Sequence, residues 1–174
     1  PENLTASSTI AFVSVAGDIE NKEPVFRAKK YFENRGYNVK LFMPEANFDY
    51  LGGTDAERLA CLHGAFSDDE VEAIVAIRGG YGSLRLLRDI DWDLIRRNPK
   101  IFVGFSDITA LLLMIYKNTK LITFHGPMIC SDFGADISKF TEQHFFETLE
   151  AGFSGTKLEN SCNGDCLLYT SDAA

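Results

Sequence analysis

The chain alternates short apolar runs with amphipathic segments, and this alternation constrains its fold more than any other feature. The run 9–16 is continuously apolar and rich in Val and Ala, as expected of a parallel strand covered on both faces. The segment 54–66 opens with the capping-box pair Thr54 and Glu57, which predicts a helix. We expect further strands at 37–43, 73–78, 100–105 and 121–124, further helices at 24–36, 83–90, 107–117 and 138–152, and a turn at 91–98. The series predicts an α/β fold with a parallel sheet and helices on both faces.

Composition excludes several classes of protein. The 174 residues are 45% hydrophobic, enough for one domain with a buried core, and the net charge of −8 argues against nucleic acid as a partner. The apolar stretch 108–116 is too short to cross a bilayer, and the apolar run near the start lacks the preceding basic segment of a signal peptide. The four cysteines form neither a zinc signature nor a disulfide framework, and we expect Cys61 and Cys130 to be buried thiols. We therefore expect a cytoplasmic protein with no membrane partner, metal or cofactor.

A glycine-rich loop, RGGYG, follows the expected strand 73–78. Ligands of parallel sheets lie beyond the carboxyl ends of the strands, and Gly79 and Gly80 would let backbone N–H groups approach an anion or oxyanion. The loop lacks both the G-x-G-x-x-G spacing and the lysine of a P-loop, which disfavours nucleotide binding. A plain tight turn is the alternative interpretation.

The stretch VGFSDITAL places Ser106 where the strand 100–105 gives way to a helix. This is the pattern of a nucleophile elbow, in which the serine hydroxyl is exposed and the N–H of the next residue, Asp107, faces the same point. Ser106 could equally be an ordinary helix N-cap. The stretch also departs from G-x-S-x-G, because Ile108 occupies the position of the final glycine.

The stretches RGGYGSLRLL, NPKIFVGFSDITAL and TFHGPM occur in that order at the ends of consecutive expected strands, and the segment 53–74 precedes them. This combination resembles the amino-terminal domain of the LD-carboxypeptidase family of serine peptidases, which includes the microcin-immunity type. The resemblance covers residues 9 to 150. It implies a flavodoxin-like sheet with a strand-to-helix nucleophile elbow. It also implies that Ser106 is the nucleophile and that Gly79, Gly80 and Asp107 form the oxyanion hole.

The activity that the resemblance implies is hydrolysis of an amide bond between an L- and a D-residue. The typical reaction releases the terminal D-alanine of a murein tetrapeptide during cell-wall recycling, and a related peptide conjugate is the other candidate substrate. Such a small peptide carries a free carboxylate, for which Arg78 or Arg85 could supply the cation. We expect Arg78, Tyr81 and His125 to contact the substrate. The sequence is silent on oligomeric state, and a homodimer stays open for the complete protein.

The resemblance also predicts what the chain lacks. In the family the catalytic triad is Ser-Glu-His, with Glu and His on a carboxyl-terminal domain. Of the three histidines, His63 and His144 fall within expected helices, and His125 matches a family position that is not the triad base. We therefore expect residues 1–160 to be the amino-terminal nucleophile domain of a truncated enzyme whose carboxyl-terminal domain is absent.

The last residues fit no element of the fold. The stretch 166–174, CLLYTSDAA, has no amphipathic period, and it back-translates without mismatch to a sequence that resembles a transposase adaptor used in sequencing libraries. We expect residues 161–174 to be a non-native or disordered tail.

The alternative for the whole chain is a non-catalytic flavodoxin-like module that binds an anion or a nucleotide, with Ser106 as a helix cap.

Overall fold

The computed structural model describes residues 2–151, so the expected tail at 161–174 and its adaptor-like part lie outside the described residues. The strands are β1 (Thr9–Val13), β2 (Asn38–Phe42), β3 (Val71–Ala76), β4 (Ile101–Gly104) and β5 (Phe124–His125). The helices are α1 (Glu23–Asn34), α2 (Asp55–Ser67), α3 (Ser83–Leu86), α4 (Trp92–Arg97), α5 (Thr109–Thr119) and α6 (Lys139–Ala151). A 3₁₀ turn, η1 (Ser106–Ile108), precedes α5, and a π turn, η2 (Ile129–Phe133), precedes α6.

The five strands form one parallel sheet in the order β2-β1-β3-β4-β5. Val13 at the end of β1 lies opposite Phe42 on β2 and Ala76 on β3, so these strands end side by side. The loops that follow the strands therefore gather at one edge. The predicted α/β fold is confirmed.

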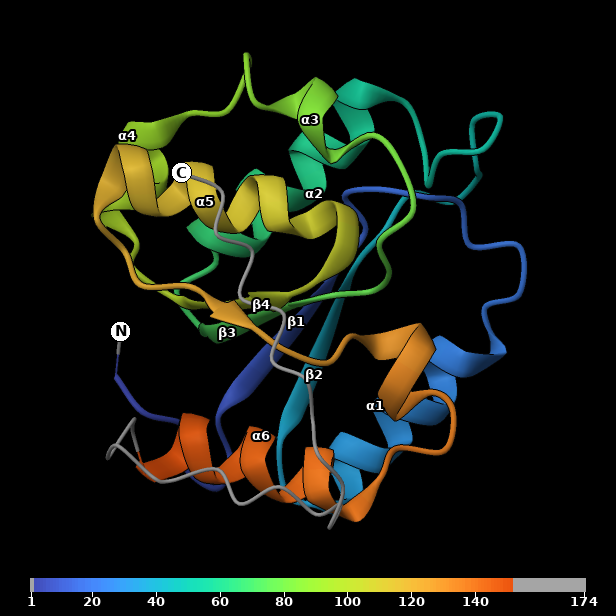
Figure 1. Cartoon of the computed structure of the whole chain (residues 1–174), viewed down its shortest axis with the longest axis vertical. Coiled ribbons are helices and arrows are strands. Elements are labelled where there is room, and N and C mark those ends of the chain that lie inside the picture. Colours follow the sequence, from blue (N-terminus) through green and yellow to red (C-terminus); the bar gives the residue numbers. More distant parts are fainter. Residues whose placement is uncertain (1, 152–174) are drawn as a thin grey trace, which may run out of the picture.

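Helices cover both faces of the sheet (Figure 1). Residues of α2, α3, α4 and α5 pack on one face with Ala11 and Val13, and residues of α1, η2 and α6 pack on the other with Ile10 and Phe12. Alternate residues of β1 thus point to opposite cores, and all of them are buried. This explains why the strand reads as a continuous apolar run rather than an alternating one.

Some boundaries differ from the sequence prediction. The expected helix 83–90 ends as α3 at Leu86, since Leu86 is buried while Leu84 is 66% exposed and the leucines define no single face. The expected strand 121–124 is shifted to the two residues of β5, and η2 was not expected. The capping box of α2 is present, with Thr54 and Glu57 each bonded to the other's backbone amide. Within residues 2–151, no helix combines the length and apolar character needed to cross a membrane.

Candidate active site

Ser106 occupies a sharp turn between β4 and α5. Phe105 is still extended, whereas Ser106 has φ of 60° and starts the turn η1. A serine avoids this left-handed region unless its surroundings impose it, because the Cβ atom crowds the backbone there. The turn leaves Ser106 exposed at the carboxyl edge of the sheet, in the strand-to-helix geometry of a nucleophile elbow.

The glycine-rich loop after β3 lies directly against Ser106. A Cβ atom added to Gly79 would stand 3.1 Å from Ser106 Cβ, 3.3 Å from Ser106 Oγ and 3.5 Å from the Asp107 amide nitrogen. Gly80 has φ of 107°, which only glycine adopts readily. Among residues 2–151, no group accepts a hydrogen bond from the amides of Gly79, Gly80 or Asp107. These N–H groups are therefore available to a negatively charged oxygen beside the hydroxyl.

A cleft of about 750 Å³ opens beside Ser106. The glycine loop and the elbow form one wall, and the segments after β1 and β5 form the others, with Asp18, Ile19, Glu20, Asn21, Pro24, Arg78, Gly79, Gly80, Phe105, Ser106, Met128, Cys130 and Ser131 as the lining residues. The structure thus brings Ser106 and Arg78 together with Gly79 and Gly80. Tyr81 and His125 are not among the described lining residues: Tyr81 is 73% exposed and packs edge-on against Tyr50, and His125 packs against Phe105.

The two arginines that the sequence offered as carboxylate ligands have different surroundings. Arg78 lines the cleft, where its Nη1 donates to the Asp18 carbonyl at 2.8 Å and lies 3.5 Å from the Asp18 carboxylate. Its guanidinium is half exposed and has further N–H groups for a ligand. Arg85 instead donates to both carboxylate oxygens of Asp55, with Nη2 at 2.8 Å from Oδ2. Only Arg78 of the pair faces the cleft.

Sequence reasoning missed the cleft residues of two segments, the one after β1 and the one after β5. Asp18 follows β1, and the rule that sites form beyond strand ends could have found it. Met128 and Cys130 belong to the segment after β5. This segment forms the π turn η2, which no local sequence pattern predicts. Burial raises the pKa of the Cys130 thiol despite the nearby Arg78, so Cys130 is held in its unreactive protonated form.

No histidine within residues 2–151 forms a hydrogen bond with Ser106. His63 Nε2 accepts from the Asp91 amide at 3.0 Å, and burial lowers the pKa of its imidazole. His144 lies on α6, with Nδ1 3.8 Å from a Glu147 oxygen. The described part of the chain therefore holds the geometry for a nucleophile and an oxyanion hole without a base in contact with the hydroxyl.

Comparison with known proteins identifies the family. The model of the LD-carboxypeptidase N-terminal domain matches residues 10–126. The chain belongs to the LD-carboxypeptidase family. A relative in Bacillus subtilis (strain 168), named "Probable murein peptide carboxypeptidase", is 41% identical over 155 residues, covering 86% of this chain and 48% of that protein.

Solved structures of the family share this fold. A microcin-immunity-like protein from Bacillus anthracis superposes with a TM-score of 0.81 and 36% identity, covering 86% of this chain and 46% of that one. The microcin C7 self-immunity protein, solved in complex with glutamyl sulfamoyl guanosine, has a TM-score of 0.80, 31% identity and the same coverage. The chain thus spans about half the length of the LD-carboxypeptidase relatives it matches.

Proposed function

We propose that this chain supplies the nucleophile and the oxyanion hole of a serine-type LD-carboxypeptidase. The observation that carries the proposal is the left-handed, exposed Ser106 with the Gly79 backbone packed against its Cβ and Oγ atoms. A plain helix cap needs neither the positive φ nor the neighbouring loop, since N-cap residues are ordinarily extended. A nucleophile elbow has both: its strained turn exposes the hydroxyl, and the neighbouring loop lets a reacting oxygen meet the hydroxyl and two N–H donors at one point.

In the proposed reaction, Ser106 Oγ attacks the carbonyl carbon of the amide that joins an L-residue to a terminal D-residue. The amides of Gly79 or Gly80 and of Asp107 stabilise the oxyanion, and the positive ends of η1 and α5 add to that stabilisation. The C–N bond then breaks, and the serine proton reaches the departing amine through a general base. Water hydrolyses the resulting ester, which restores the hydroxyl and releases the shortened peptide.

The substrate that we propose is a small peptide with a free terminal carboxylate, such as a murein tetrapeptide or a related conjugate. Arg78 is the cation of choice for that carboxylate, because it lines the cleft and keeps N–H groups free of its Asp18 contacts. The named activity of the Bacillus subtilis relative supports the murein peptide. The recycling role that the family resemblance implies leads us to propose a cytoplasmic site of action.

The general base is proposed to come from a further domain. Relatives are about twice the length that this chain spans, and within residues 2–151 no histidine is bonded to Ser106. The triad Glu and His would then belong to the carboxyl-terminal part that the family resemblance implies. The 174-residue chain alone should be nearly inactive, since loss of a triad base lowers turnover by several orders of magnitude.

The test is release of D-alanine from an L,D-tetrapeptide. The 174-residue chain is compared with residues 1–151 joined to the carboxyl-terminal half of the Bacillus subtilis relative, each with a Ser106→Ala control. We expect negligible release from the chain alone, and turnover by the joined protein that the substitution abolishes. Rapid release by the chain alone, abolished by Ser106→Ala, would show that the base lies within it. Turnover that survives Ser106→Ala would refute the proposed nucleophile.

A further inference from the structure

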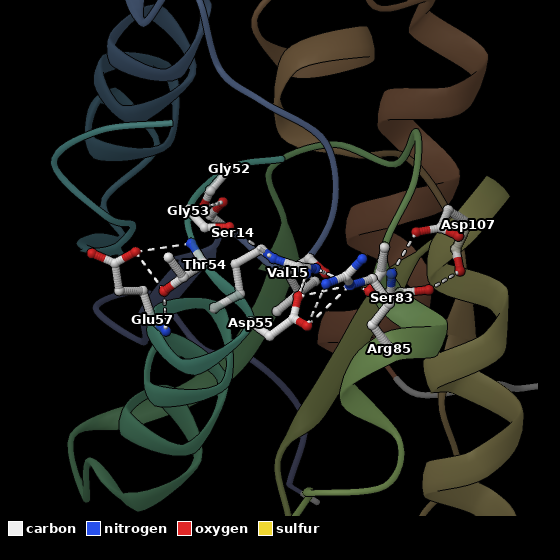
Figure 2. Close-up of polar contacts among 12 residues, drawn as sticks. Ser14, Val15, Gly52, Gly53, Thr54, Asp55, Glu57, Ser83, Arg85 and Asp107 are labelled. Carbon is white, nitrogen blue, oxygen red and sulfur yellow. Dashed lines mark hydrogen bonds and ion pairs between the residues drawn. The ribbon is translucent and has the colours of Figure 1, made fainter. Parts of the chain in front are cut away.

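Asp107, the residue after the proposed nucleophile, is held at two points by one buried serine. The Ser83 amide donates to Asp107 Oδ2 at 2.9 Å, and the Ser83 hydroxyl donates to the Asp107 backbone carbonyl at 2.6 Å. Ser83 is fully buried and Asp107 is half-buried, so both bonds are partly shielded from water. Figure 2 shows Ser83 and Asp107 side by side; Ser83 starts α3, and Asp107 lies in the turn η1 that precedes α5. The two contacts join the elbow to the glycine loop.

The residue before Ser83 is fastened from the opposite side. Arg58, on α2, is fully buried, and its Nη1 donates to the Gly82 carbonyl at 3.0 Å and to the Val15 carbonyl at 2.9 Å. Its Nε donates to the Gly53 carbonyl at 3.2 Å, and its Nη2 is paired with Asp55. Every nitrogen of this buried guanidinium has a partner, so any movement of Arg58 would leave part of a buried charge unsatisfied. Arg58 therefore fixes the end of the glycine loop to two other backbone segments, at Val15 and at Gly53.

These contacts form a continuous path from α2 to the nucleophile. Arg58 holds Gly82, Ser83 follows Gly82 in the chain, and Ser83 holds both the backbone and the carboxylate of Asp107. The path links the two segments whose amides are proposed to meet at the oxyanion, and neither Arg58 nor Ser83 lines the cleft described above. An oxyanion hole works only when its donors are fixed before the charge develops.

We infer that Ser83 is a positioning residue, anchored by Arg58, that sets the distance between the glycine loop and the Asp107 amide. The inference deepens the proposed function and rests on it. Loss of the Ser83 hydroxyl releases the Asp107 carbonyl, so that the Asp107 residue should shift and its N–H should lose its fixed direction, while Ser106 and every amide donor stay in the chain. Acylation of Ser106 should then slow without any loss of the nucleophile.

The experiment compares Ser83→Ala with Ser14→Ala in the 174-residue chain. Ser14 is a matched control, because its buried hydroxyl also donates to a backbone carbonyl, that of Gly52 at 3.1 Å, but makes no contact with Asp107. The first readout is the rate at which diisopropyl fluorophosphate labels Ser106, a reaction in which Oγ displaces fluoride from phosphorus. The second is the ³¹P chemical shift of the adduct, whose phosphoryl oxygen occupies the oxyanion position. The third, made without probe, is the set of Ser106 and Asp107 amide chemical shifts.

Ser83→Ala is expected to slow labelling about tenfold, the effect of one lost hydrogen bond, and to move the ³¹P signal, while Ser14→Ala changes neither. Equal labelling rates and ³¹P shifts in wild type and Ser83→Ala would overturn the inference. If the 174-residue chain is labelled too slowly to measure, as the proposed absence of its general base allows, the amide shifts alone decide: Asp107 shifts that move only in Ser83→Ala uphold the positioning role, and unmoved shifts refute it. The proposed function is tested separately, by the turnover of the joined protein. If Ser83→Ala fails to fold, Asp107→Ala replaces it, because this variant removes the carboxylate that accepts from the Ser83 amide. The same measurements and the same expected outcomes then apply to Asp107→Ala.

Discussion

Ser106 combines an unfavourable backbone conformation with the role that we propose for its hydroxyl as nucleophile. Its φ of 60° costs about 1–2 kcal/mol for a residue with a Cβ atom. The surrounding structure sustains that conformation because β4 and α5 are both buried against the core. Left-handed non-glycine residues cluster at functional sites for this reason, and Ser106 fits that rule.

Replacing Ser106 by glycine should therefore stabilise the fold while removing the proposed nucleophile. We expect Ser106→Gly to raise the melting temperature by about 2–4 °C, corresponding to about 1 kcal/mol. Ser106→Ala should give no such gain, because alanine keeps the Cβ atom. Calorimetry of the three proteins measures the effect. Lys120→Gly is the positive control, since Lys120 has φ of 64° at the end of α5, far from the glycine loop in sequence. If Ser106→Gly melts at or below the melting temperature of Ser106→Ala, the backbone at position 106 is not strained and the prediction is wrong.

At the scale of the element, the start of α2 carries two separate polar arrangements that Figure 2 displays: the capping box and the contacts of Asp55. Arg85 on α3 and the buried Arg58 both donate to the Asp55 carboxylate. The Arg85 guanidinium, and then Arg58, hold the pKa of Asp55 below its ordinary range. The carboxylate thereby ties α2 to α3 at the edge of the sheet where the glycine loop ends.

This arrangement predicts a pH dependence of stability. The pKa of Asp55 is lower in the folded than in the unfolded chain, so the unfolded state binds more protons in acid. The contribution is complete above the unfolded pKa of about 4 and is lost as the pH falls through the folded value. Urea unfolding between pH 7 and pH 3 should show a shallower loss of stability for Asp55→Asn than for wild type. Glu23→Gln, at an exposed pair on α1, is the control and should follow wild type. If the free energy of unfolding falls equally with pH in Asp55→Asn and in wild type, Asp55 does not cause the loss of stability in acid.

Local signals explain which elements could be predicted. The capping box of α2 and the continuous apolar run of β1 each depend on residues that are close in the sequence, so both could be predicted. The turn at Ser106 was predictable because a buried strand ends there in small residues and an apolar helical run follows. Arg58 could not be predicted as a buried anchor, since arginine is ordinarily exposed and its Val15 partner lies 43 positions away. Contacts at such separations depend on the sheet order, which no local pattern contains.

At the scale of the whole molecule, one aromatic cluster holds the face of the sheet opposite to α2 and α5. Phe32 of α1 is fully buried, with its ring 4.7 Å from that of Phe133 and 5.7 Å from that of Phe146 between centroids. The cluster joins α1, η2 and α6, which are far apart in the sequence but adjacent in space (Figure 1). The segment before α6 therefore depends on this core for its position beside the cleft.

Phe32→Ala should lower the free energy of unfolding by about 3–5 kcal/mol, because it removes a large buried ring and leaves a cavity. Leu113→Ala is the surface control: Leu113 is 64% exposed on α5, and its loss should change stability by less than about 0.5 kcal/mol. Urea unfolding followed by circular dichroism gives both values. A Phe32→Ala effect no larger than that of Leu113→Ala would show that the aromatic cluster does not stabilise the fold.

We propose that Ser106 is the nucleophile of this LD-carboxypeptidase domain, and the residue to which a covalent probe becomes attached tests that proposal. Residues 1–151 joined to the carboxyl-terminal half of the Bacillus subtilis relative are treated with a fluorophosphonate probe, digested and mapped by mass spectrometry. We expect a single adduct on Ser106, absent from Ser106→Ala and much weaker in the 174-residue chain alone. An adduct on another residue, or equal labelling of the Ser106→Ala protein, would contradict the claim.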